Sequence, residues 1–296
     1  MTNYDVLIVG AGCAGLTAAI YAARAGRRVA VFEGMGIGGQ IATSPLVENY
    51  PGLASVSGMD FSNALLEQAM SFGAELIPAM VNRLRAEGDL RILETDDGEF
   101  SAPAVILATG THHRPLGVEG EEKLVGRGVS YCATCDGAFF RGKTVAVVGG
   151  GSAALVSAGM LADLCEKVYL IHRRTEFRGE AALADRLQTR PNVEMVLGET
   201  VAELVEANGL LSGVVLASGR KLELNGLFVA VGQQPDNAAF ADAVELDERG
   251  YIRAGEDCRT SMPGVWAAGD CRTKAVRQLT TAAADGTAAA LAACGG

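Results

Sequence analysis

The chain has 296 residues, of which 38 are glycine, 49% are hydrophobic and 5% are aromatic. This hydrophobic content excludes a disordered chain, and the clustering of the glycines at a few turns excludes collagen. The formal net charge of −10 argues against nucleic acid as a partner. The chain shows no apolar run of the ~20 residues that span a bilayer and no secretory signal at its N-terminus. We therefore expect a cytoplasmic protein without membrane contacts.

The first part of the chain is predicted to form a strand, a glycine-rich turn, an alanine-rich helix and a second strand, at residues 6–9, 10–15, 16–25 and 29–32. The turn has the GxGxxG spacing, with Gly10, Gly12 and Gly15. The first glycine permits a tight turn, the second lets a pyrophosphate approach the backbone, and the third allows the helix to pack on the strand. Glu33 follows the second strand, and its carboxylate is suited to a ribose diol. We expect FAD or NAD at this turn.

The same order of elements recurs in the second half of the chain, at residues 145–148, 149–154, 155–164 and 168–171. The predicted contacts at this second turn are Gly149, Gly151, Ser152 and Ala153. His172 stands where the first copy has Glu33, and three arginines follow it, Arg173, Arg174 and Arg178. A guanidinium pairs with phosphate oxygens that a carboxylate would repel, so this copy should select NADP over NAD. The chain is therefore expected to hold FAD and NADPH together.

Two strand–turn–helix–strand units predict an α/β fold with two parallel sheets, that is, two Rossmann-like three-layer nucleotide-binding domains. Apolar strands at 104–108 and 226–230 are each followed within a few residues by a proline, which is typical of a strand leaving its sheet into a linker. The second unit is then inserted into the first. The expected domains are an FAD domain at 1–114, an NADPH domain with the cysteine pair at 115–243, and the rest of the FAD domain at 244–296.

Cys132 and Cys135 form a CxxC motif that is followed directly by Asp136. A zinc site would need two more ligands, but the chain offers no second CxxC and only three histidines, so no metal is expected. The spacing suits a pair that cycles between disulfide and dithiol, with Asp136 as a nearby proton donor or acceptor. Near the C-terminus a further apolar strand ends at Asp270, whose carboxylate can accept a hydrogen bond from a flavin ribityl hydroxyl.

Further motifs have a specific spacing: Gly-Gly-Gln at 38–40, Val-Glu-Asn-Tyr-Pro-Gly at 47–52, Ala-Thr-Gly at 108–110, Cys-Ala-Thr-Cys-Asp-Gly at 132–137, His-Arg-Arg at 172–174 and Arg-Gln at 277–278. With the two glycine-rich turns and Gly269-Asp270, the chain resembles the bacterial-type, low-molecular-weight thioredoxin reductases over nearly its full length.

The resemblance implies a set of site residues and partners. Cys135 would face the flavin, Cys132 would exchange with the protein substrate, and Asp136 would be the acid/base. The substrate would be thioredoxin or a thioredoxin-like protein, and the enzyme a homodimer. The implied FAD contacts are Gly39, Gln40, Thr43, Asn49, Val81, Thr109, Gly110, Asp270, Arg277, Gln278 and Leu279.

The expected reaction passes hydride from NADPH to FAD, electrons from the flavin to the Cys132–Cys135 disulfide, and then reduces thioredoxin by dithiol–disulfide exchange. Two alternatives of the same fold stay open. A ferredoxin-dependent flavin thioredoxin reductase would not need the arginine cluster. A small-molecule dithiol oxidase would keep the cysteines but should lack a working NADP site.

Overall fold

The computed structural model describes residues 4–44 and 46–295, and these divide into two compact units. Unit 1 contains the described residues up to His112 and from Gln234 onward, and unit 2 contains His113–Gln233. None of the described helices is both long and apolar enough to cross a membrane. Each unit has its own parallel sheet and its own hydrophobic core.

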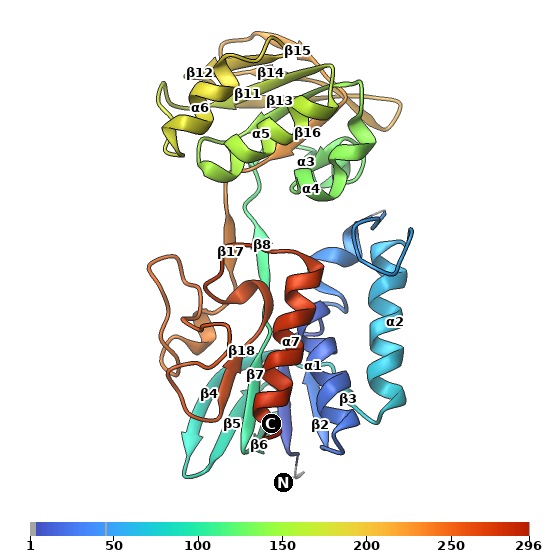
Figure 1. The fold of residues 1–296 in the computed structure, drawn as a ribbon, viewed down its shortest axis with the longest axis vertical. Helices are drawn as coiled ribbons and strands as arrows, with labels where there is room; N and C mark the ends of the chain where they lie inside the picture. Colours follow the sequence, from blue (N-terminus) through green and yellow to red (C-terminus); the bar gives the residue numbers. More distant parts are fainter. Residues whose placement is uncertain (1–3, 45, 296) are drawn as a thin grey trace. The chain divides into compact units, whose positions relative to one another are not determined.

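The sheet of unit 1 has the strand order β18-β7-β1-β2-β3. Its strands are β1 (Val6–Val9), β2 (Val29–Phe32), β3 (Glu75–Ile77), β7 (Ala104–Leu107) and β18 (Val265–Ala267), all paired in parallel. One face is covered by α1 (Cys13–Arg24), α2 (Gly58–Ser71) and α7 (Leu279–Ala293), which stand side by side in Figure 1. The other face carries the antiparallel strands β4 (Val81–Glu87), β5 (Leu90–Thr95) and β6 (Gly98–Ala102).

Alternation along β1 explains why this sheet needs a layer on both faces. Val6 and Ile8 are buried among the helix residues, while Leu7 and Val9 are buried among residues of the β4–β6 layer. Successive side chains of a strand point to opposite faces, so an uninterrupted apolar strand is stable only between two layers. The three-layer arrangement expected from the sequence is confirmed.

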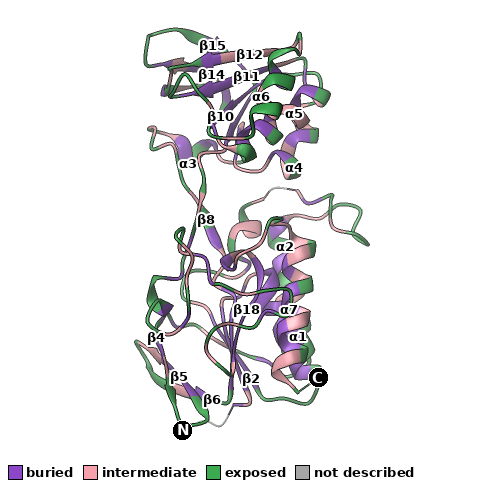
Figure 2. Cartoon of the chain, turned by 60° about the vertical axis from the view of Figure 1, so that its left-hand side comes forward, coloured by how far each residue is buried: buried purple, intermediate pink, exposed green. Residues whose placement is uncertain are grey.

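Unit 2 repeats this architecture with the strand order β12-β11-β10-β16-β9. The strands are β9 (Val129–Ser130), β10 (Thr144–Val148), β11 (Lys167–His172), β12 (Val193–Leu197) and β16 (Gly226–Val229). Helices α5 (Ser152–Leu164) and α6 (Ala181–Gln188) lie against one face. The antiparallel strands β13 (Val201–Ala207), β14 (Leu210–Leu216) and β15 (Lys221–Glu223) lie against the other. Figure 2 shows the central strands buried and many of the connecting turns exposed.

Two short strands connect the units, β8 (Thr111–His113) and β17 (Gln233–Pro235), and they pair with each other. The division by contact falls at 112/113 and 233/234, whereas the sequence suggested 114/115 and 243/244. The second difference has a physical cause. Phe240 is 2% exposed in the core of unit 1, and the Asn237 amide donates to the carbonyl oxygens of Gly250 and Cys271 at 2.9 Å each. Residues 234–243 therefore belong with unit 1.

Candidate active site

The first glycine-rich turn joins β1 to α1, and its three glycines are constrained differently. A Cβ on Gly10 would lie 2.3 Å from the Ala108 carbonyl oxygen, and one on Gly15 would lie 1.9 Å from the Gly10 carbonyl oxygen. A Cβ on Gly12 would meet only one atom, at 3.8 Å. Glycine is thus required at the outer two positions by the packing of the chain itself. The middle one leaves the backbone open beside the N-terminus of α1, as a bound pyrophosphate requires.

The second turn, between β10 and α5, shows the same division of roles. A Cβ on Gly149 would lie 2.4 Å from the Ala230 carbonyl oxygen, while one on Gly151 would meet nothing within 4 Å. Ser152 and Ala153 begin α5 and are exposed. Both turns therefore fit a dinucleotide by the same criterion, an open second glycine of the motif that follows a closed first one.

Glu33, at the end of β2, ties that strand to the first turn. Its Oε2 accepts the Ala11 N–H at 2.9 Å, and its Oε1 accepts the N–H groups of Met35 and Gly36 at 2.8 and 3.0 Å. A carboxylate oxygen can accept two hydrogen bonds, so Oε2 keeps one lone pair for a ribose hydroxyl.

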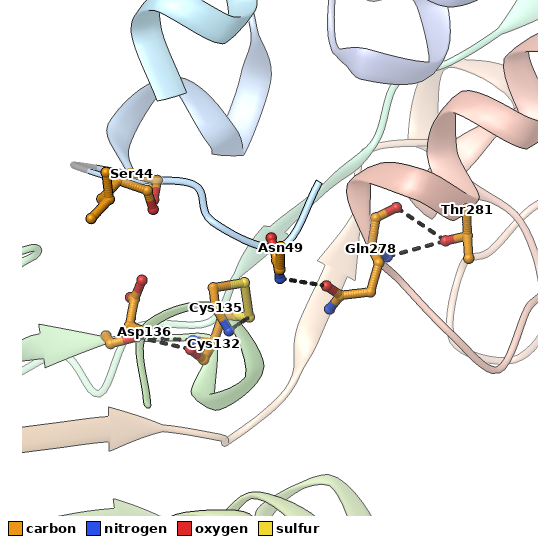
Figure 3. Close-up of a disulfide and its surroundings, with 9 residues drawn as sticks. Ser44, Asn49, Cys132, Cys135, Asp136, Gln278 and Thr281 are labelled. Carbon is orange, nitrogen blue, oxygen red and sulfur yellow. Dashed lines mark hydrogen bonds between the residues drawn. A yellow bond between two sulfur atoms is a disulfide. The ribbon is translucent and has the colours of Figure 1, made fainter. Parts of the chain in front are cut away.

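Several expected flavin contacts gather around the first turn. Gly39, Gln40 and Thr43 form the short helix η1 (Gly39–Thr43), which is held to the turn by the Gly38 N–H donating to the Ala11 carbonyl at 2.9 Å. The Asn49 amide donates to Gln278 at 3.4 Å, as Figure 3 shows. Leu279 opens α7, and its carbonyl accepts the Cys13 thiol at 3.4 Å.

Other predicted contacts lie elsewhere in unit 1. Val81 begins β4 with its side chain 6% exposed in the core. Gly110 leads into β8, and the Thr109 hydroxyl donates to Asn237 at 2.7 Å. Arg277 stacks on Tyr251 at 4.2 Å. Its guanidinium also donates to the carbonyl oxygens of three loop residues, Asp270, Arg272 and Lys274. The arginine side chain thus shapes the loop that follows Asp270.

Asp270 lies in η4 (Gly269–Cys271), directly after β18. Its Oδ1 is buried and has no hydrogen-bond partner among the described residues. Burial raises its pKa to about 6, and nearby Lys274 and Arg277 limit the rise. A buried acceptor without a donor is costly, so this oxygen fits a hydroxyl of a bound cofactor.

The loop on both sides of Asp270 depends on a buried ionic cluster that the sequence did not reveal. Asp285 of α7 accepts hydrogen bonds from the Gly269 N–H at 2.9 Å, from Arg272 at 2.7 and 2.8 Å, and from Lys274 at 2.8 Å. The side chains of the three ionic partners are only 3 to 8% exposed. An acidic residue inside an alanine-rich helix was the available signal.

In unit 2, the His172 ring and the Arg178 backbone contact the second turn. The His172 ring packs so closely on Gly150 that a Cβ there would lie 2.1 Å from it, and it stacks on Phe177 at 5.5 Å. Burial, helped by the three nearby arginines, lowers the pKa of His172. The Arg178 N–H donates to the Gly150 carbonyl at 2.7 Å. The side chains of Arg173, Arg174 and Arg178 are exposed and form no ion pair within the described part of the chain.

Cys132 and Cys135 are joined as a disulfide with a Cα–Cα distance of 5.3 Å (Figure 3). Cys132 caps the short helix α4 (Ala133–Asp136), and its Sγ accepts the Cys135 N–H at 3.2 Å. Asp136 adjoins the disulfide, and burial raises the pKa of its carboxyl. Both cysteines are partly exposed. Four of the five described free cysteines are buried: Cys13, Cys165, Cys258 and Cys271.

Comparison with known proteins agrees with this geometry. The family described as pyridine nucleotide-disulphide oxidoreductase matches residues 4–286. The chain belongs to this family. It is 42% identical to a thioredoxin reductase of Treponema pallidum, over 99% of this chain and 96% of that one, and 39% identical to one of Bacillus subtilis, over 97% and 92%. The crystal structure of a thioredoxin reductase from Streptococcus pyogenes matches with a TM-score of 0.93 at 39% identity, covering 98% of this chain and 97% of that one.

Within this oxidoreductase family, the chain thus matches thioredoxin reductases over nearly its full length. Family members use a flavin and a pyridine nucleotide. Each unit of this chain has one glycine-rich turn with an open position. The Cys132–Cys135 pair fits the redox-active disulfide of such enzymes. The resemblance inferred from the sequence motifs is confirmed.

Three residues that hold the chain before Cys132 of this reductase were not predicted from the sequence. Ser130 donates to Asp136 at 2.6 Å. Tyr131 donates to Glu121 at 2.7 Å and stacks on His113 at 4.8 Å. Glu121 is 3% exposed and also accepts two backbone N–H groups of the segment that follows β8. These contacts fix the chain on the N-terminal side of Cys132, and no sequence motif predicts them.

Proposed function

We propose that this chain is an NADPH-dependent thioredoxin reductase that carries FAD. The observation that carries the proposal is the partly exposed Cys132–Cys135 disulfide with a buried carboxyl next to it, on a chain with two open glycine-rich turns. When bound, FAD accepts hydride from NADPH and supplies the two electrons that reduce a disulfide.

The cysteine motif carries out the exchange with the protein substrate. The Cys132 sulfur attacks the substrate disulfide, forming a mixed disulfide and releasing one substrate thiolate. The Cys135 sulfur then attacks Cys132, which restores the enzyme disulfide and releases the second substrate thiolate. Asp136 takes the proton of the attacking thiol and returns it to the leaving sulfur. Two electrons and two protons pass in total from the enzyme dithiol to the substrate.

The cofactors are assigned to the residues that the sequence singled out. The first turn would hold FAD, with Glu33 accepting from the adenosine ribose and Asp270 accepting from the ribityl chain. NADPH lies on the second turn, and the exposed guanidinium groups of Arg173, Arg174 and Arg178 pair with its 2′-phosphate. His172 contributes as the packed ring on which this basic segment rests, because its pKa is lowered and its ring is buried.

The proposal extends to the homodimer that the resemblance implies. The helical face of unit 1 exposes large apolar side chains, Tyr21, Met59, Met70, Phe72 and Leu291. Protein interfaces bury exposed apolar side chains of this kind. Analytical ultracentrifugation is expected to give twice the monomer mass, and a monomer at micromolar concentration would contradict this assignment.

The function is tested by incubating the purified protein with NADPH and oxidised thioredoxin and counting the thiols formed by mass spectrometry. Two thiols per NADPH consumed are expected. Reduction with reduced ferredoxin but not with NADPH would instead support the ferredoxin-dependent enzyme. Oxygen consumption driven by a small dithiol, with no use of NADPH, would support the dithiol oxidase.

The middle glycines give a direct test of the two dinucleotide positions. Gly12 and Gly151 have φ of −82° and −94°, which alanine adopts without strain, and neither substitution meets a close atom. We expect Gly12→Ala to lose FAD and to melt no lower than the cofactor-free wild type. Gly151→Ala should keep FAD and raise the KM for NADPH about tenfold or more, because a methyl group replaces a phosphate contact.

The matched comparison is Gly15→Ala, whose Cβ would lie 1.9 Å from the Gly10 carbonyl oxygen and should disrupt folding. Flavin absorbance per chain, thermal melting and steady-state kinetics report the three outcomes. Full FAD content in Gly12→Ala would show that the first turn does not bind FAD. An unchanged KM for NADPH in Gly151→Ala would show that the second turn does not bind NADPH.

Asp270 should make FAD binding depend on pH. Its pKa is raised to about 6, so the carboxyl is charged above that pH and protonated below it. A ribityl hydroxyl that donates to the carboxylate binds the charged form better, so FAD should bind about tenfold more tightly at pH 7 than at pH 5. Fluorescence titration of the cofactor-free protein measures this, and a dissociation constant independent of pH would contradict it.

The same carboxyl affects stability with the opposite sign. In the unfolded chain it titrates at its ordinary pKa, so the folded, cofactor-free protein loses stability as pH rises from about 4 to about 6. Asp270→Asn removes this loss. The variant should therefore melt higher than wild type at pH 7 without FAD, while binding FAD more weakly. Asp257→Asn, at an exposed carboxylate of the same unit, is the control and should change neither quantity.

A further inference from the structure

Ser130 lies at the end of β9 and contacts both functional ends of the cysteine motif. Its Oγ donates to Asp136 Oδ2 at 2.6 Å and accepts the Cys132 N–H at 3.1 Å. The Cys132 carbonyl oxygen is a more distant acceptor, at 3.4 Å. A hydroxyl has one hydrogen to donate, so the much shorter contact identifies Asp136 as its acceptor. The residue is 4% exposed, so water does not compete for these bonds.

The backbone holds this hydroxyl in place. Ser130 pairs with Phe228 in the parallel ladder between β9 and β16, and Phe228 is 1% exposed in the core of unit 2. The Asp136 N–H in turn donates to the Cys132 carbonyl at 3.0 Å. The cysteine motif is therefore attached to the sheet through Ser130. Asp136 is held by hydrogen bonds of both its side chain and its backbone.

The two oxygens of the Asp136 carboxyl have different surroundings. Oδ2 receives the Ser130 hydrogen, whereas Oδ1 is buried without a hydrogen-bond partner among the described residues. Burial raises the pKa of Asp136, and the Ser130 hydrogen bond is the contact that lowers it. The nearest other titratable groups of the motif, Cys132 and Cys135, are held in the disulfide. Protonation of a buried carboxylate oxygen without a hydrogen-bond partner removes the largest desolvation cost of the charged group.

We propose that Ser130 is a positioning residue that holds Asp136 by Oδ2 and leaves Oδ1 as the oxygen that carries the proton in disulfide exchange. This inference rests on the acid/base role proposed above for Asp136. As the Cys132 sulfur forms its bond to a substrate sulfur, its proton moves to Oδ1 and the substrate S–S bond breaks. Oδ1 then gives the proton to the released substrate thiolate. No other oxidant or reductant enters this step.

The test compares Ser130→Ala with Ser130→Thr, which keeps a hydroxyl, in the FAD-loaded full chain. The carboxyl pKa is read from the ¹³C shift of aspartate-labelled protein, using the resonance that disappears in Asp136→Asn. We expect Ser130→Ala to raise this pKa by about one unit, since it removes a hydrogen bond to the charged form. The acidic limb of the kcat/KM profile for oxidised thioredoxin should move by the same amount, an approximately tenfold loss at the acidic end.

Ser130→Thr should restore both values, and Ser212→Ala, which removes a serine hydroxyl elsewhere in unit 2, should leave both unchanged. If Ser130→Ala does not fold, Ser130→Gly removes the same hydroxyl. An unchanged carboxyl pKa overturns the proposal, and so does a raised pKa with an unmoved activity profile. A wild-type protein that reduces no thioredoxin contradicts the proposed function instead, and the ¹³C titration then still tests the contact itself.

Discussion

Cys135→Ser is expected to abolish disulfide reduction while leaving FAD bound. The cysteine pair lies in unit 2, and the proposed FAD contacts lie in unit 1, so removing one sulfur takes nothing from the flavin site. The remaining Cys132 thiol can form a mixed disulfide with the substrate, but no second sulfur displaces it. Turnover of thioredoxin should fall by at least about a thousandfold, as expected when a covalent nucleophile is removed.

The measurement is NADPH-dependent reduction of thioredoxin, together with the flavin absorbance per chain. Mass spectrometry should find the variant trapped as a one-to-one mixed disulfide with the substrate. Cys294→Ser is the matched control, because Cys294 is the one described free cysteine that is partly exposed, and it should retain full activity. Turnover within tenfold of wild type in Cys135→Ser would mean that the electrons bypass the disulfide.

Removing the arginine cluster is expected to abolish the preference for NADPH over NADH. Arg173, Arg174 and Arg178 are exposed and free of ion pairs in the described structure, so they need not break an internal contact to bind phosphate. A hydrogen bond to a charged group contributes about 1.5–3 kcal/mol, but exposure places these at the lower end. Arg173→Ala with Arg174→Ala should raise the KM for NADPH about a hundredfold and change the KM for NADH little.

Kinetics with the two nucleotides separate this effect from general damage to the turn. Arg220→Ala removes one positive charge from a different part of unit 2, where the arginine pairs with Glu194, and should leave both KM values unchanged. An equal rise in the KM values for NADPH and NADH would show that the arginines maintain the shape of the turn. No loss with either nucleotide would assign the 2′-phosphate contact to other residues and reopen the ferredoxin-dependent alternative.

The features that the sequence predicted are those determined by neighbouring residues. A buried parallel strand, a turn whose first glycine has no room for a Cβ, and a helix that starts at once leave a local pattern, so both glycine-rich turns could be located. The disulfide was predictable for the same reason, since two cysteines three positions apart can meet within one turn.

The features that the sequence missed depend on residues far apart in the chain. Asp285 meets Gly269 and Arg272 only after α7 packs beside β18. An acidic residue inside an alanine-rich helix does not indicate which residues it will contact. Asn237 accepts from Thr109 across 128 positions, and this contact helps to place the end of the inserted unit at 233 instead of 243. Ser130 belongs to a strand of two residues, too short to show a periodic pattern.

NADPH is proposed as the electron donor to a bound flavin, and anaerobic stopped-flow absorbance tests this most directly. The purified FAD-containing protein is mixed with NADPH, and with NADH at the same concentration as the control. Rapid bleaching of the flavin by NADPH, with far slower bleaching by NADH, is the predicted result. Flavin that stays oxidised with both nucleotides would contradict the account, because the electrons would then have to come from another donor.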